Sequence, residues 1–149
     1  MSIRYGHTSI VAQDWRRLAE FYASVFGCEM VPPERALDAG WLGEGVGIPG
    51  AALSGVHLRL PGSGPDGPTL EIFQYAQGLP PAPRVANRAG YGHIAFMVDD
   101  VAAALATVCA AGGSAAGRVA TGDVPGRGSL TFVYAADPEG NLIELQRWG

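Results

Sequence analysis

The sequence predicts an α+β fold built from two similar modules, each a strand, a helix and three further strands. A stretch that begins at Tyr5-Gly6-His7 returns 86 residues later as Tyr91-Gly92-His93. In both copies an aspartate that can cap a helix follows the histidine by seven residues, and a glycine that can end the helix follows it by twenty. Because one βαβββ module leaves a face of its sheet uncovered, we expect the two modules to pair.

In the first module, expected at about residues 1–76, hydrophobic periodicity separates one amphipathic helix from four strands. The helix over Asp14–Phe26 carries its apolar residues on one face and is stopped by Gly27. Alternating or β-branched stretches predict the strands, which are Ile3–Val11, Cys28–Val31, Ala51–Leu60 and Thr69–Tyr75. We expect the helix to lie on the sheet, and Pro32-Pro33 to end the second strand.

The segment Glu34–Gly50 is rich in glycine and weakly patterned, yet it contains large apolar residues, Trp41 among them. Two interpretations are open, a lid that folds over a pocket or a surface excursion anchored by Trp41. Two glutamates described below are 73 residues apart, whereas the repeated histidines are 86 apart. The second module is therefore 13 residues shorter, and we expect this segment to hold the difference.

The stretch Ala76–Gly90 contains three prolines and no periodicity, which predicts a linker between the modules. The second module, at about residues 90–149, has an expected helix over Asp100–Ala111 and a glycine-rich loop over Thr121–Ser129. Its expected strands are Tyr91–Val98, Ala115–Ala120, Leu130–Ala135 and Leu142–Trp148. We expect residues 1–149 to form a single domain of eight strands with both helices outside.

Composition argues against several classes of partner. The formal net charge is −4, so the chain has no basic footprint that would suggest nucleic acid. The sequence contains no run of about 18 apolar residues, the length that a membrane-spanning helix needs. Met1–Arg4 shows no signal-peptide pattern, so we expect a soluble cytoplasmic protein. Cys28 and Cys109 lie in apolar contexts, and we expect both to be buried and to have no redox role.

Two glutamates, Glu71 and Glu144, stand in the last predicted strand of each module, where glutamate is unusual. Each is flanked by two aliphatic residues. Because side chains alternate along a strand, each glutamate faces away from those neighbours and toward the inside of the sheet, and His7 and His93 can face inward too. Two imidazoles and two carboxylates at matching places in a repeat suit a first-row divalent metal that keeps positions for water or substrate.

Four other residues are weaker candidates for substrate binding. His57 and Arg59 lie on the face of their strand opposite its apolar residues, which would place them near the site. The same positions also suit solvent-facing residues on a half-exposed strand. Arg127, in a predicted loop, would meet an anionic substrate or is simply solvated. A buried Trp41 would fit stacking of an aromatic ligand in a non-catalytic binding protein.

These residues resemble the vicinal oxygen chelate superfamily, which includes glyoxalase I, methylmalonyl-CoA epimerase, extradiol dioxygenases and bleomycin-binding proteins. The resemblance covers nearly the whole chain and rests on Tyr5-Gly6-His7, Phe21-Tyr22 through Phe26-Gly27, Gly92 through Val101, and Asp137 through Leu145. It implies paired βαβββ modules that form a cup-shaped mixed sheet around a metal. The implied ligands of one divalent ion, whether nickel, cobalt, zinc, manganese or iron, are His7, Glu71, His93 and Glu144.

By this resemblance the chain is an enzyme, either a glyoxalase I-like lyase or an epimerase-like isomerase. In such enzymes a metal stabilises an enediolate or enolate after a base removes the proton next to a carbonyl. Glu144 and Glu71 are the candidate bases; we favour Glu144, and the resemblance does not decide between them.

Two alternatives stay open. One is a non-haem iron dioxygenase, whose relatives use two histidines and one glutamate, so that a glutamate at Glu71 is unexpected. The other is a non-catalytic antibiotic-binding or resistance protein, whose relatives lack the metal ligands. The expected partner is a small-molecule substrate, and the unpaired sheet edges of such modules lead us to expect a homodimer. No motif specific for glutathione or coenzyme A is present, so the lyase and isomerase interpretations stay close together.

Overall fold

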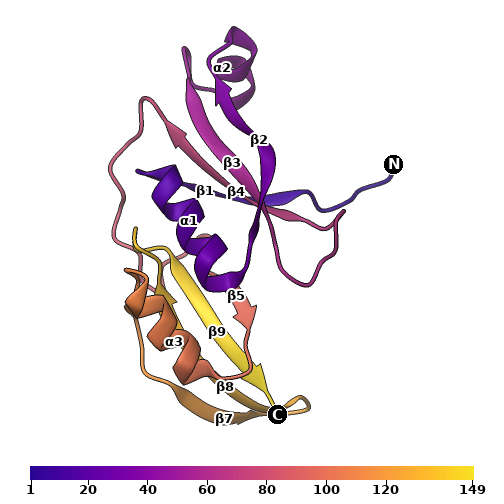
Figure 1. Ribbon diagram of the computed structural model, residues 1–149, viewed down its shortest axis with the longest axis vertical. Coiled ribbons are helices and arrows are strands. Elements are labelled where there is room, and N and C mark those ends of the chain that lie inside the picture. The colour runs from indigo at the N-terminus through magenta and orange to yellow at the C-terminus, as the bar shows by residue number, and fades with distance from the viewer. The chain divides into compact units, whose positions relative to one another are not determined.

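The computed structural model describes residues 1–149, which divide into two compact units, Met1–Pro80 and Pro81–Gly149. The first unit contains β1 (His7–Val11), α1 (Trp15–Phe26), β2 (Glu29–Leu37), α2 (Gly40–Val46), β3 (Leu53–Arg59) and β4 (Thr69–Tyr75). The second contains β5 (Ile94–Met97), α3 (Val101–Ala110), β6 (Ser114–Ala115), β7 (Ala120–Val124), β8 (Gly128–Ala136) and β9 (Leu142–Trp148). The predicted α+β class is confirmed (Figure 1).

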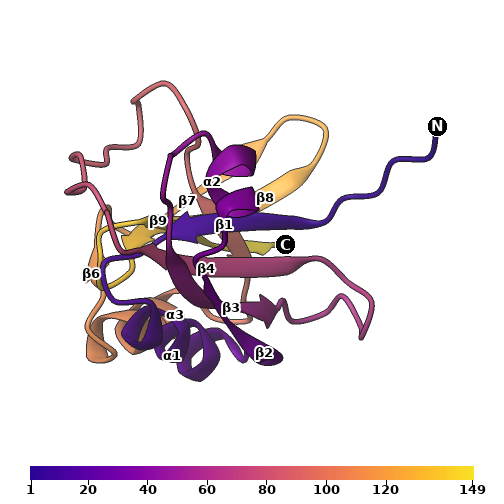
Figure 2. The same ribbon diagram turned by 90° about the horizontal axis from the view of Figure 1, so that it is seen from above.

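The first unit is a mixed sheet in the order β1-β4-β3-β2. Strand β1 runs parallel to β4, whereas the β4–β3 and β3–β2 pairs are antiparallel. Helix α1 packs against β3 and β4, and Figure 2 shows it on one side of this sheet. The core of the unit lies there, because the side chains that alternate toward α1, such as Val56, Leu70 and Ile72, are buried.

The second unit repeats this plan in the order β5-β9-β8-β6, with β7 also paired to β8. Strand β5 is parallel to β9, and the remaining pairs are antiparallel. Helix α3 packs against β8 and β9. Ile143 and Leu145 of β9 are fully buried, so the alternation predicted around Glu144 is confirmed.

Both helices begin at the aspartates that the repeat predicted. The Asp14 carboxylate accepts a hydrogen bond from the Arg17 backbone N–H at 3.1 Å, and Asp100 accepts one from Ala103 at 2.9 Å. Such caps satisfy N–H groups that have no partner within the helix. Helix α1 ends at Gly27 with a φ of 67°, as predicted. Helix α3 ends at Ala110, earlier than expected, and Gly112 takes the positive φ.

Several predicted strand boundaries are wrong. Strand β2 continues through Pro32-Pro33 because it lies at the sheet edge, where a missing N–H donor costs little, and its register against β3 shifts between Val31 and Arg35. Strand β1 starts at His7, because its pairing with β4 begins there. The expected loop Thr121–Ser129 is instead largely a β7–β8 hairpin, whereas only Ser114–Ala115 of the preceding region pairs as β6.

Helix α2 occupies the segment for which a lid or a surface excursion was expected. Leu42 anchors it, packed with Ala51 and Leu53. Trp41 is 62% exposed, so it is not the anchor that the surface-excursion interpretation assumed, nor the buried ring that ligand stacking would need. The connection between β2 and β3, residues 38–52, is much longer than that between β7 and β8, residues 125–127, which confirms where the second module is shorter.

The two cysteines differ. Cys28 is buried as expected, and burial raises the pKa of its thiol to about 11. Cys109 is exposed on α3, so that prediction is wrong. The helices of this chain include none that is both long and apolar enough to cross a membrane.

Candidate metal centre

The first unit brings His7 and Glu71 together. His7 opens β1 and Glu71 stands at the middle of the adjacent parallel strand β4. The His7 Nε2 atom lies 3.5 Å from Glu71 Oε2. Leu70 and Ile72 on either side of Glu71 are fully buried against the α1 side, so alternation sends the carboxylate to the other face, where its side chain is 14% exposed.

A third donor, His57, lies against the same carboxylate. His57 on β3 is directly opposite Glu71 in the antiparallel register, and its Nε2 lies 3.1 Å from Glu71 Oε2. Its Nδ1 lies 2.8 Å from the Thr69 hydroxyl. The ligand atoms of His7, His57 and Glu71 all lie within 4.8 Å of one another, so this group could hold a metal ion. The sequence assigned His57 to weak substrate binding and missed this contact.

Burial of the His57 imidazole lowers its pKa, and the positive charge of Arg35 and the proximity of His7 act in the same direction. The nearby Glu71 carboxylate opposes this effect without reversing it. The lowered pKa favours the neutral form of the ring. A neutral imidazole is the form that coordinates a metal.

The second unit brings together the matching pair. His93 immediately precedes β5, and Glu144 stands in β9, which pairs with β5 in parallel. Their Nε2 and Oε2 atoms are 2.8 Å apart, and the Glu144 side chain is 15% exposed. The residue opposite Glu144 on β8 is Tyr134, whose ring centroid lies 4.8 Å from that of His93. This unit thus offers one imidazole and one carboxylate beside a phenol.

The remaining candidates have other partners. The Arg59 guanidinium lies 3.1 Å from the Glu29 carboxylate on the edge strand β2. Arg127 stacks over the Trp148 ring, with its guanidinium carbon 4.4 Å from the ring centroid. Trp41 projects from α2 into solvent. The contacts of Arg59 and Arg127 give these two residues a structural explanation that requires no substrate.

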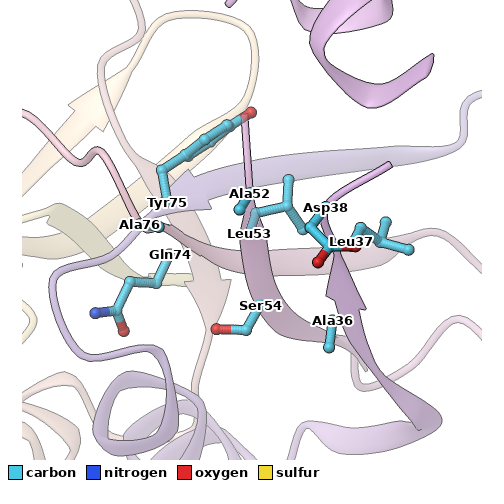
Figure 3. A pocket seen from close by; sticks show the side chains of 9 residues that line it. All are labelled: Ala36, Leu37, Asp38, Ala52, Leu53, Ser54, Gln74, Tyr75 and Ala76. Carbon is cyan, nitrogen blue, oxygen red and sulfur yellow. The ribbon is translucent and has the colours of Figure 1, made fainter. Parts of the chain in front are cut away.

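Each unit also carries a cavity. In the first unit a cavity of about 350 Å³ is lined from β2, β3 and β4, and Figure 3 shows Tyr75 and Gln74 leaving β4 on opposite sides there. His7, His57 and Glu71 do not line it. In the second unit a cavity of about 430 Å³ is lined by Tyr134, the neighbour of His93, and by Arg84 and Arg118. His93 and Glu144 do not line this second cavity, and its link to them is Tyr134, whose ring contacts that of His93.

The donor set fits a divalent first-row metal. Imidazole and carboxylate together suit zinc, nickel, cobalt, iron and manganese, and every donor named here stands on a strand or directly beside one. Strands hold ligands with little freedom, which lowers the entropic cost of binding an ion.

Comparison with known proteins gives a family match over most of the chain. Residues 4–145 match the Glyoxalase/Bleomycin resistance protein/Dioxygenase superfamily. The fold is similar to that of a glyoxalase family protein from Bacillus cereus, with a TM-score of 0.81, 19% identity, and coverage of 99% of this chain and 95% of that one. No curated protein matches the chain in sequence.

Two further solved structures share the fold at lower similarity. A glyoxalase I mutant from Zea mays aligns with a TM-score of 0.61 and 23% identity, over 96% of this chain and 44% of that one. A glyoxylase/bleomycin resistance protein/dioxygenase domain from Frankia sp. EAN1pec aligns with a TM-score of 0.60 and 16% identity, over 100% of both chains. At these identities the likeness concerns the fold.

Proposed function

This chain belongs to the glyoxalase, bleomycin resistance protein and dioxygenase superfamily, and on that premise we propose that it is a divalent-metal-dependent lyase or isomerase of the glyoxalase I or epimerase type. The observation that carries the proposal is the repeated pair. In each unit a histidine at the start of the first strand lies beside the glutamate of the last strand, at 3.5 Å and 2.8 Å. We propose His7, Glu71, His93 and Glu144 as metal ligands.

When bound, the metal supplies Lewis-acid polarisation of a substrate carbonyl. The residues of the chain position the substrate and move its proton. A glutamate removes the proton next to the carbonyl and returns it either to the neighbouring carbon or to the other face of the same carbon. The first outcome is the lyase or isomerase type of rearrangement, and the second is an epimerisation.

We propose Glu144 as the base. Its carboxylate contacts one imidazole, whereas that of Glu71 contacts two. Glu144 therefore has more oxygen lone pairs available for a substrate proton. The second unit also has a cavity lined by Tyr134, the residue whose ring contacts that of His93, and we propose it as the place for a small-molecule substrate. We propose a homodimer as the working form.

A non-haem iron dioxygenase is the second candidate, and one observation favours it. His7, His57 and Glu71 provide two imidazoles and one carboxylate within a single unit. This is the ligand set of many non-haem iron oxygenases. The nature of the bound metal separates the two proposals.

Elemental mass spectrometry of the purified protein tests the proposal first. About one nickel, cobalt, zinc or manganese ion per chain, bound more weakly by the variant His93→Ala/Glu144→Ala than by the parent, supports the lyase or isomerase. Thiol adducts of dicarbonyls and acyl thioesters are then the substrates to assay. Iron as the bound ion favours the dioxygenase over the lyase or isomerase. A parent protein that takes up none of these ions refutes the metal centre.

A further inference from the structure

We infer that His57 is a metal ligand, and that the first unit therefore binds a divalent cation through His7, His57 and Glu71 without help from His93 and Glu144. The inference rests on the proposed metal centre and extends it by one residue. It begins from the register, in which His57 on β3 is directly opposite Glu71 on β4. The shared face of these two strands thus presents an imidazole and a carboxylate side by side.

The spacing of the donor atoms fits a single ion. Ligand atoms that lie about 2.1 Å from a metal are about 3.0 Å apart when they are neighbours in an octahedral site, and about 3.4 Å apart in a tetrahedral one. The Glu71 Oε2 atom is 3.1 Å from His57 Nε2 and 3.5 Å from His7 Nε2. Small side-chain rotations would bring all three atoms to bonding distance, since none of the three donors is more than 4.8 Å from another.

The His57 ring is oriented in the way that ligating histidines usually are. Such a histidine uses one ring nitrogen for the metal and fixes the other with a hydrogen bond. Here Nδ1 is 2.8 Å from the Thr69 hydroxyl, which leaves Nε2 facing Glu71. The rings of His7 and Phe73 also pack against it in T-shaped contacts, with centroids at 5.2 Å and 5.8 Å. A hydroxyl both donates and accepts, so Thr69 can serve the tautomer that ligation requires.

A hydrogen bond from His57 to Glu71 is the competing explanation, in which the imidazole only orients the carboxylate. The two explanations differ in what removal of the ring does to a bound ion. An orienting residue leaves the number of coordinated imidazoles unchanged, whereas a ligand reduces it by one. The test therefore counts imidazoles directly and does not rely on activity.

The experiment uses the full chain freed of metal by a chelator. Competition with a chromophoric chelator for zinc measures the affinity of three proteins. They are the parent, the double variant His93→Ala/Glu144→Ala, and this double variant with His57→Phe added. We expect the double variant to bind one Zn²⁺. The added His57→Phe change should weaken binding by more than about a hundredfold, beyond the roughly 10- to 100-fold loss that follows removal of a residue that only orients a ligand. Tyr134→Phe, added to the same double variant, changes the residue matching His57 in the second unit. It is the control and should alter the zinc affinity of the double variant by less than about threefold.

Zinc X-ray absorption then counts imidazoles in the zinc-loaded double variant. We expect two imidazoles with His57 present and one with His57→Phe. The chain has three histidines, so His7 alone remains when His93 and His57 are both replaced. A count of one imidazole both with and without His57, or an affinity that His57→Phe does not change, overturns the inference. Thermal unfolding of the metal-free variants identifies loss of folding, and His57→Gln, which keeps a polar side chain, must weaken zinc binding as well for the inference to stand.

The outcomes separate this inference from the proposed function. A parent that binds zinc, with a double variant that does not, overturns the independence of the first unit and leaves the four-ligand proposal intact. A parent that binds no zinc, nickel, cobalt, manganese or iron overturns both.

Discussion

The two modules place the same pair of residues by the same register but differ in the third residue beside it. In each, the strand with the glutamate lies between the strand that begins near the histidine and a third strand. Opposite Glu71 the third strand presents His57, and opposite Glu144 it presents Tyr134. The duplicated backbone thus fixes two donors in each module and leaves a third position free to vary.

A second difference lies two residues farther along the same strands. The first module has Gly55 on β3 opposite Phe73 on β4, whereas the second has Phe132 on β8 opposite Gln146 on β9. The large ring therefore stands on the glutamate strand in one module and on the neighbouring strand in the other. The rings meet different partners, because Phe73 packs on His57 and Phe132 packs on Tyr134.

The largest expected effect concerns the two glutamates, because the proposal gives the modules unequal roles. With a substrate identified and metal at saturation, Glu144→Gln should lower kcat by about 10²- to 10⁴-fold, the usual contribution of a general base. Glu71→Gln should act mainly by weakening metal binding, so excess metal should recover much of its activity. Steady-state kinetics over a metal titration distinguishes the two, and the reverse pattern would move the base to Glu71.

The turns before the two glutamate strands should also differ in their contribution to stability. Asp137 is buried and accepts hydrogen bonds from the Glu139 N–H at 2.9 Å, the Asn141 N–H at 3.0 Å and the Asn141 side-chain amide at 2.6 Å. Asp137→Ala should therefore reduce the free energy of unfolding by about 2 to 4 kcal/mol.

Asp66 is the matched control for this comparison, since it lies exposed in the connection before β4. Its change to alanine should alter the free energy of unfolding by less than about 0.5 kcal/mol. Denaturant unfolding followed by circular dichroism measures both. Equal losses in the two variants would mean that the Asp137 hydrogen bonds add nothing to the stability of the second module.

Close packing at Gly55 should give a smaller difference in the free energy of unfolding between the two modules. A Cβ there would overlap the carbonyl oxygen of Ile72 and the ring of Phe73, so Gly55→Ala should cost about 1 to 3 kcal/mol. Gly122 in β7 has open space around it, and Gly122→Ala should be nearly neutral. Thermal unfolding of the two variants tests this, and a neutral Gly55→Ala would show that the β4 backbone at Ile72, as well as the Phe73 ring, shifts at little cost.

Periodicity and caps predict the parts of this fold that depend on neighbours along the chain. Asp14 and Asp100 cap their helices, and alternation puts Glu71 and Glu144 on the face away from the helices. The contact of His57 with Glu71 depends instead on how the connection 60–68 sets the register of β3 against β4. Alternation places His57 on the correct face, but no local pattern reports a cross-strand register.

Two other misses have the same origin. The strand β2 passes Pro32-Pro33 because it is an edge strand, and the order of strands in a sheet is a property of the whole fold. The anchor of α2 is Leu42 rather than Trp41, because the helix presents Leu42 to Leu53 and turns the larger ring outward. Size alone favoured the tryptophan, and the direction of a short helix decided otherwise.

The smallest expected effect compares the cysteines near the ends of the two main helices. Cys28 is buried, and its pKa of about 11 leaves only about 0.1% of it as reactive thiolate at pH 8, against about 10% for a thiol with the ordinary value of 9.0. Cys109 is exposed on α3. An aromatic disulfide reagent at pH 8 should therefore modify one thiol per native chain rapidly, and Cys109→Ser should abolish that fast phase. If both thiols reacted at the same rate, the structure around Cys28 would have to open so readily that burial gives no protection. In denaturant, both thiols of the parent should react.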